Sequence, residues 1–407
     1  MDLIDDRVYR VMRAHGISAQ TGFLAEHPLA WLPGDPYDLK RTAEFVRLDE
    51  LAYMLEYNVA HQEVARAVAL LPMPSRSFEG LPEEVLYRLM LIYAMYAHAY
   101  FRETLNYANV SELMRDTQTH FLPPQLAVPL YELSQLIGML ATMAYTLYSL
   151  RNWRLKNPAF PISLDDLAMM HSFTGSESEH WFVCDHQAVE VEMAAANFAF
   201  LKADQLVVDA INAGSMGYPQ PRELAAVLRQ AGEASYRALA VFRRMREHCD
   251  YRIYFDTVRL FYGFPRNVVY EGVEALGDAP QNYFGETGGQ APFQHLRLAI
   301  LGMDHEKFPY FPQMRQHMPL QFRTLIEAKL SSPVRAYILA YGHQAHVREA
   351  RDAYNFCVQA VVDWRVFHLE LAQEYIWNLG DRHGTGTTPF DWLQLLIDHA
   401  RSFLIAA

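Results

Sequence analysis

Helical periodicity runs through most of the chain and constrains its fold more than any other feature. Apolar residues recur at steps of three and four over long segments, whereas alternating, strand-like runs are few. Because this spacing puts apolar side chains on one face of an α-helix, we predict an all-α protein. The predicted helices are Leu48–Leu71, Pro82–Tyr107, Leu130–Leu150, Trp181–Ala213, Pro221–Glu247, Arg252–Tyr262, Phe322–Glu327, Ser332–Tyr341, His346–Leu379 and Pro389–Ile405.

The composition is that of a globular protein with an excess of acidic residues. The 407 residues are 51% hydrophobic and 20% charged, and the formal net charge is −12. Because nucleic acids and anionic membrane surfaces attract concentrated Lys and Arg, we expect neither as a partner. The longest charge-free run, Leu133–Leu150, contains several Ser, Thr and Gln residues, which favours a buried helix over a membrane span.

Cysteine usage and the first residues favour a reducing compartment. Cys184, Cys249 and Cys357 are odd in number, far apart and in no CxxC pattern. This distribution argues against a disulfide framework and against a structural zinc site. The first residues include no apolar segment of the kind that a secretory signal needs, so we expect a cytoplasmic protein.

A loop-forming stretch at Lys156–Pro161 divides the chain into two predicted domains. We expect a small N-terminal helical domain at residues 1–158 and a large helical domain at residues 159–407. Glycine clusters mark two further loops, Gly285–Gln290 and His383–Thr388. Such clusters let a backbone pass close to a flat ligand or let a lid move, although an ordinary flexible connector has the same composition.

Two histidines lie on apolar faces of long predicted helices. His368 shares a stripe with Trp364, and Arg365 precedes it by one turn. An imidazole in an apolar wall beside a cation suits axial haem ligation, with the guanidinium paired to a haem propionate. A core histidine bonded to a carbonyl produces the same pattern. His186 could orient or deprotonate a substrate, or simply pair with Glu190 one turn later.

Sequence words along almost the whole chain resemble those of the indoleamine 2,3-dioxygenase family, within the haem-dependent tryptophan dioxygenase superfamily. No single word is decisive, and their order, spacing and number carry the resemblance. It implies an all-helical fold in which a small N-terminal and a large C-terminal domain enclose one haem b. The words are HGISAQTGFLAEHP (His15–Pro28), LPPQLAVPLYELSQ (Leu122–Gln135), NWRLKNP (Asn152–Pro158), HSFTGSESEHWF (His171–Phe182), VVYEGV (Val268–Val273), FGETGGQAPFQ (Phe284–Gln294), MRQHMPLQFR (Met314–Arg323), REARDAYNFCVQAVVDWRVFHLELAQEYI (Arg348–Ile376) and HGTGT (His383–Thr387).

The resemblance implies a dioxygenase that inserts O2 across the C2–C3 bond of an indole such as tryptophan. His368 is the implied iron ligand, and Arg259 is the implied partner of the substrate carboxylate. The implied cofactor-binding residues are Arg365, Gly285, Thr287 and Gly288, and the implied substrate-binding residues are Tyr145, Phe182, Phe255, Arg259, Gly384 and Thr385. The last two open a mobile lid that runs on through Gly386 and Thr387. The implied partners are O2, the aromatic amino acid and an electron donor that keeps the haem ferrous.

The residue above the distal face of the haem departs from the usual indoleamine pattern. An ungapped alignment from Trp181 puts His186 where the family usually has Ser. A register shifted by two residues puts Ala188 there instead. Because Trp181 and Phe182 are the firmest anchors nearby, we follow the ungapped spacing and assign His186 as the catalytic residue. The tryptophan 2,3-dioxygenase branch carries a histidine in this role.

Three further departures lie in the two glycine loops. Glu286 stands where the family has a second glycine, and His383 and Thr387 replace a common Lys and a common Gly of the lid. They keep two other functions open. One is a superfamily haem enzyme that monooxygenates or rearranges an aromatic amino acid. The other is a non-catalytic O2 or haem sensor, against which the retained Arg259 argues, since a sensor has no use for a carboxylate clamp.

Overall fold

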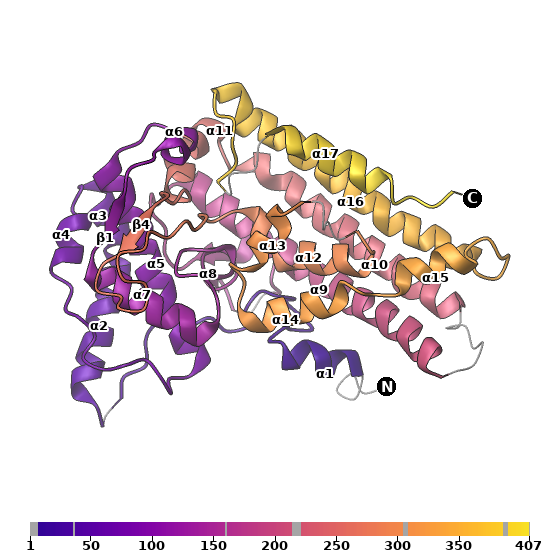
Figure 1. Cartoon of the computed structure of the whole chain (residues 1–407), viewed down its shortest axis with the longest axis horizontal. Coiled ribbons are helices and arrows are strands. Elements are labelled where there is room, and N and C mark those ends of the chain that lie inside the picture. The colour runs from indigo at the N-terminus through magenta and orange to yellow at the C-terminus, as the bar shows by residue number, and fades with distance from the viewer. Residues whose placement is uncertain are drawn as a thin grey trace.

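The computed structural model of the protein describes residues 7–35, 37–158, 161–213, 221–303, 308–385 and 390–406. These residues form helices joined by loops and by a few three-residue strands, which confirms the predicted all-α fold (Figure 1). None of the helices in these ranges is both long and apolar enough to cross a membrane. The longest helices are α5 (Glu83–Leu105), α9 (Glu177–Asn212), α10 (Pro221–Phe242) and α16 (Arg348–Tyr375).

Three long helices form the frame of the half of the molecule that holds the C-terminus. Both α9 and α16 pack against α10, which buries an apolar stripe that includes Leu228 and Leu239. Because α9 and α16 share one partner, their inner faces converge on Phe242, the last residue of α10 (Figure 1). The shorter helices around this frame are α1 (Arg7–Ala14), α12 (Pro292–Ile300), α13 (Tyr310–Arg315), α14 (Leu320–Lys329), α15 (Val334–Tyr341) and α17 (Phe390–Arg401).

The helices at the other end of the molecule surround α5, most of whose residues are buried (Figure 1). Helices α4 and α7 pack directly against it. The domain boundary after residue 158 stays a prediction, although α1, which precedes it, contacts α9, which follows it. The helices of this end are α2 (Leu39–Tyr53), α3 (Leu55–Ala60), α4 (Val64–Ala69), α6 (Val110–Arg115), α7 (Pro124–Ile137) and α8 (Tyr145–Tyr148).

Two pairs of short strands tie distant segments together. Strands β1 (His120–Leu122) and β4 (Val268–Tyr270) pair in parallel, so the chain returns to the α5 end after leaving the α9–α10 frame. Strands β2 (Trp153–Leu155) and β3 (Leu167–Met169) pair antiparallel. The β2–β3 pair leads into α9, whose first turn is capped by the Ser176 side chain accepting from the Glu179 backbone N–H.

Three predicted helices are wrong in extent. The segment 48–71 contains the end of α2 and the short helices α3 and α4, separated at Gln62, which has a φ of 55°. The segment 130–150 is broken because Gly138 takes a φ of 75° and ends α7. The segment 252–262 is a succession of α-helical (α11, Tyr251–Ile253), π-helical (Tyr254–Val258) and 3₁₀ (Arg259–Phe261) turns.

The close packing of α10 on α16 depends on Gly232. A Cβ added there would lie 2.3 Å from the Cδ1 atom of Phe356. Glycine to alanine normally stabilises a helix by about 0.5–1 kcal/mol. We expect Gly232→Ala to lower the free energy of unfolding by about 1–3 kcal/mol instead, because Phe356 must be displaced.

Denaturant unfolding followed by circular dichroism measures this effect. Ala226, on an exposed position of the same helix, is the control, since Ala226→Gly reports helix propensity alone and should cost about 1 kcal/mol. A Gly232→Ala protein more stable than the wild type would contradict the packing explanation.

Candidate functional site

A large cavity lies between α9 and α16, beside the end of α10. It has about 1680 Å³ of empty volume including its open mouth, which leaves room for a cofactor beside a substrate. Its walls also include the loop 286–291, residues Tyr310 and Phe311, and the segment 383–385. Of the residues predicted to form the site, those that line it are Tyr145, Phe182, His186, Arg259, Thr287, Gly288, Arg365, His368, Gly384 and Thr385.

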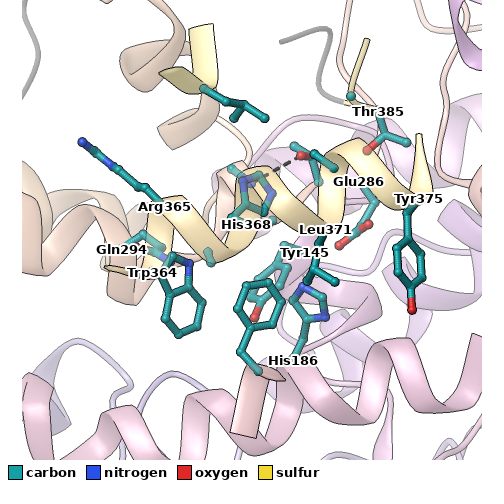
Figure 2. A pocket seen from close by; sticks show the side chains of 18 of the residues that line it. Tyr145, His186, Glu286, Gln294, Trp364, Arg365, His368, Leu371, Tyr375 and Thr385 are labelled. Carbon is teal, nitrogen blue, oxygen red and sulfur yellow. Dashed lines mark hydrogen bonds between the residues drawn. The ribbon is translucent and has the colours of Figure 1, made fainter. Parts of the chain in front are cut away.

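His368 projects from α16 into this cavity (Figure 2). The stripe predicted around it is real, since Val361, Trp364 and Leu371 are buried on the same helix. Burial, with smaller contributions from His186 and Arg365, lowers the pKa of His368 to about 4. Its imidazole is therefore neutral at physiological pH, which is the form that binds a metal ion.

His186 lies on the facing wall, on α9. Its Nδ1 is 2.8 Å from the Phe182 carbonyl oxygen, which can only accept, so the ring donates through Nδ1–H. Nε2 then carries the lone pair, and it is the nearest atom, at 3.9 Å, to a Cβ built on Gly288. Burial lowers the pKa of His186, which keeps the imidazole neutral. His186 thus presents a hydrogen-bond acceptor to the cavity.

The ring of Phe242 lies near both imidazoles. Its centroid lies 5.9 Å from that of His186 and 6.5 Å from that of His368. Ala188, the residue that a shifted alignment would place at the distal position, is buried and does not line the cavity. The simple pairing of His186 with Glu190 does not occur either, because His186 bonds the backbone instead.

Tyr145 and Phe182 complete the wall around His186. The ring centroids of Phe182 and His186 are 4.6 Å apart, and those of Tyr145 and His186 are 5.9 Å apart. The backbone N–H of Tyr145 donates to the side-chain carbonyl of Gln290 at 3.0 Å, which links α8 to the glycine loop. The cavity wall next to His186 is therefore aromatic on both sides.

Arg259 is fully buried and already has an acidic partner. Its Nη1 donates to a carboxylate oxygen of Asp381 at 2.6 Å, and its Nη2 donates to the His383 carbonyl oxygen. Burial alone would raise the pKa of Asp381, but Arg259 and Ser111 outweigh it and lower that pKa. Phe255 does not line the cavity, and its ring centroid lies 5.6 Å from the guanidinium carbon of Arg259. Sequence reasoning missed Asp381.

The loop 285–290 passes close to other backbone. Gly285 does not line the cavity, and a Cβ there would lie 1.8 Å from the Tyr262 carbonyl oxygen, so glycine is required for packing. Thr287 and Gly288 do line it, and the Thr287 hydroxyl accepts from the Gly289 N–H at 3.3 Å. In the predicted lid, Gly384 and Thr385 line the cavity, whereas Gly386 and Thr387 lie outside the described residues.

The sequence departure Glu286 also reaches the cavity. Its side chain is 3% exposed, and burial raises its pKa to about 8. Arg365 lines the opposite part, where its Nη1 donates to the Leu396 carbonyl oxygen of α17 (Figure 2). Burial lowers the pKa of Arg365 to about 10, so its guanidinium stays charged at neutral pH.

The residues present fit a haem better than a metal ion held by protein ligands alone. Among the described residues, no group of three or more His, Cys, Asp or Glu side chains could hold a metal. A haem needs a single axial imidazole, which His368 offers, and an apolar pocket. Apolar side chains supply much of the wall: Val189, Phe242, Met245, Ala291, Phe293, Trp364, Leu371, Ala372, Leu393 and Leu396.

The sequence is similar to those of known proteins over most of its length. Residues 11–388 match the family described as indoleamine 2,3-dioxygenase. Indoleamine 2,3-dioxygenase 1 of Mus musculus is 26% identical over 98% of this chain and 96% of its own length. The 6-hydroxytryptophan 2,3-dioxygenase of Fusarium equiseti is 23% identical over 92% and 86%, and a myoglobin of Haliotis madaka is 23% identical over 63% and 65%. The chain belongs to the indoleamine 2,3-dioxygenase family.

Proposed function

We propose that this protein binds haem b through His368 and inserts both atoms of O2 across the C2–C3 bond of an indole amino acid such as tryptophan. The observation that carries the proposal is a pair of neutral imidazoles, His368 and His186, on facing walls of one cavity. When bound, the haem supplies ferrous iron, which activates O2. An electron donor that keeps the iron ferrous and a cytoplasmic location belong to the same proposal.

The two residues that would contact the cofactor both lie on α16. His368 would hold the iron through its neutral ring, and Arg365, one turn earlier, would pair with a haem propionate. Gly288 would let the loop backbone pass close to the macrocycle, whereas Gly289 makes room for the Tyr310 hydroxyl. Thr287 fixes that turn by accepting from the Gly289 N–H. The apolar wall keeps water away from the reacting atoms.

The substrate carboxylate would bind Arg259. Its Nε–H is buried with no partner among the described atoms, so this donor remains beside those used by Asp381 and His383. A substrate carboxylate that binds Arg259 together with Asp381, or in its place, would also be linked to the lid. Asp381 and His383 lead directly into Gly384 of that lid. Binding of the substrate and closure of the segment 383–385 are then coupled.

His186 would accept the indole N–H through Nε2. The Phe182 carbonyl fixes the tautomer, so the lone pair is oriented before the substrate arrives. Phe182 and Tyr145 would flank the indole ring with aromatic surface. His186 therefore orients the substrate, while the oxygen chemistry belongs to the cofactor.

Labelled oxygen tests the reaction itself. The reduced, haem-loaded protein is incubated with L-tryptophan under ¹⁸O2, and the product is analysed by mass spectrometry. Two labelled atoms in one N-formylkynurenine molecule are expected. One labelled atom, or none, would replace the proposal with a monooxygenase or a rearrangement, and no product despite bound haem would favour a sensor.

We expect His368→Ala to lose stable haem binding, because it removes the only imidazole that α16 contributes to the cavity. Haem content, measured from the Soret absorbance per protein, should fall to a small fraction and return when imidazole is added. His186→Ala, on the facing wall, is the matched control and should keep its haem. Equal haem content in the two variants would refute the assignment of the ligand.

We expect Arg259→Met to weaken the binding of L-tryptophan by about 10- to 100-fold, the usual loss for a charge-assisted contact. Tryptamine, which lacks the carboxylate, should bind with almost unchanged affinity. Asp381→Asn should act in the opposite direction on tryptophan, because it removes the anion that competes for Arg259. Optical titration of the haem-loaded variants measures both effects, and an equal loss for both ligands would exclude a carboxylate clamp.

We expect His186→Ser to lower kcat/KM by about 10- to 100-fold, since a hydroxyl is the weaker acceptor. The pH profile gives the sharper test. Because burial lowers the pKa of His186 below its ordinary 6.5, the active neutral form persists at pH 7 and is lost only at lower pH. The acid limb of the wild-type profile should therefore lie below pH 6.5 and should disappear in His186→Ser. An unchanged acid limb would assign the titration to another group.

A further inference from the structure

Glu286 carries a buried carboxyl group that has no role in the proposed reaction. Its side chain is 3% exposed and lines the cavity, and it lies in the loop that Gly285 anchors against the Tyr262 carbonyl. In Figure 2 its carboxyl group is directed into the space between α16 and His186. None of the described residues forms a hydrogen bond or an ion pair with it, and burial is the one cause of its raised pKa.

Such a group is unfavourable unless a ligand satisfies it. A buried polar group without a hydrogen-bond partner destabilises the fold. Glu286 does not hold its own loop by hydrogen bonds, since the loop is fixed by Gly285, Thr287 and Gln290. The carboxyl is therefore placed to act on what enters the cavity rather than on the protein around it.

The surroundings of Glu286 indicate which ligand group it meets. Burial raises the pKa of Tyr254, while Arg259 lowers it and Glu286 raises it, so a cationic and an acidic side chain both lie close to this tyrosine. Glu286 and Arg259 line the same cavity, and Arg259 bonds the carbonyl of His383 in the predicted lid. A cationic and an acidic side chain in one cavity complement the carboxylate and the ammonium of one amino-acid zwitterion.

We propose that Glu286 binds the α-ammonium group of the substrate and makes the site selective for amines over deaminated indole acids. This role rests on the proposed function and adds a second charged contact to Arg259. Arg259 would recognise the carboxylate and Glu286 the ammonium, while His186 accepts the indole N–H. The three contacts together would recognise the carboxylate, the ammonium and the indole ring of the amino acid.

Binding of an ammonium should release a proton from Glu286. With a pKa of about 8, roughly nine-tenths of the carboxyl is protonated at pH 7 before the ligand arrives. A cation favours the carboxylate, so the proton leaves to the buffer. The other titratable groups that face it do not follow, because burial raises the pKa values of Tyr145, Tyr254 and Tyr262 and lowers that of His186.

The test uses the haem-loaded protein and three ligands that differ by one charged group each. L-Tryptophan carries both groups, indole-3-propionate lacks the ammonium, and tryptamine lacks the carboxylate. Dissociation constants come from optical titration of the Soret band without O2, so turnover plays no part. Glu286→Gln should weaken tryptophan and tryptamine by about 10- to 100-fold and leave indole-3-propionate unchanged.

Glu190→Gln is the matched control. Glu190 is also buried, has a pKa raised to about 8 by burial, and lies on α9 outside the cavity lining. Glu190→Gln replaces an equally buried carboxyl that does not line the cavity, so all three affinities should stay as in the wild type. Calorimetry at pH 7 in two buffers of different ionisation enthalpy should show almost one proton released by wild type with tryptamine and none by Glu286→Gln.

Other outcomes of these titrations would contradict ammonium binding by Glu286. An equal loss for all three ligands, or loss of haem in Glu286→Gln, would make Glu286 a structural or cofactor residue. If Glu286→Gln does not fold, Glu286→Asp should retain the preference for amines, and its loss there would contradict the proposal. A wild-type protein that shows no spectral response to any indole would overturn the proposed function itself.

Discussion

The packing of α9 and α16 on opposite sides of α10 determines the rest of this structure. It brings His186 and His368, 182 positions apart in sequence, to facing walls of one cavity with the ring of Phe242 near both. Close packing such as that at Gly232 leaves the helices little freedom to separate. The distance between the two imidazoles is therefore a property of the bundle and not of a flexible loop.

Burial sets the charge state of nearly every group that faces the cavity. It lowers the pKa values of His186 and His368 and raises those of Tyr145 and Glu286, so each neutral form is favoured. The neutral imidazoles suit metal ligation on one wall and hydrogen-bond acceptance on the other. Arg259 forms a buried ion pair with Asp381, and it is the cation to which an anionic ligand must be matched.

The helices that hold the site were predictable because they are long and strongly periodic. The segments around His186 and His368 were found close to their observed limits, and their apolar stripes were correct. The break at Gly138 was missed, because the apolar run continues through it and only the positive φ ends the helix. Short helices such as α12 and α13 contain too few turns to show a periodic pattern.

The partners of the site residues could not be predicted in the same way. The ion pair of Arg259 with Asp381 spans 122 positions, and no local pattern marks such a contact. Gly285 and Phe255 were assigned to the site from the family resemblance, but neither lines the cavity. Gly285 packs against the Tyr262 carbonyl, and Phe255 lies beside Arg259. Glu286 was visible only as a departure from the family. Its burial in the cavity, and hence its raised pKa, depends on the three-dimensional arrangement of the surrounding rings.

A crystal structure of the haem-loaded protein with L-tryptophan tests the central claim most directly. The account predicts the iron bound by Nε2 or Nδ1 of His368 and the macrocycle beside Phe242 and Trp364. It also predicts the indole on the opposite face with its N–H toward His186. Iron bound by any other side chain, or a haem outside the cavity between α9 and α16, would contradict it.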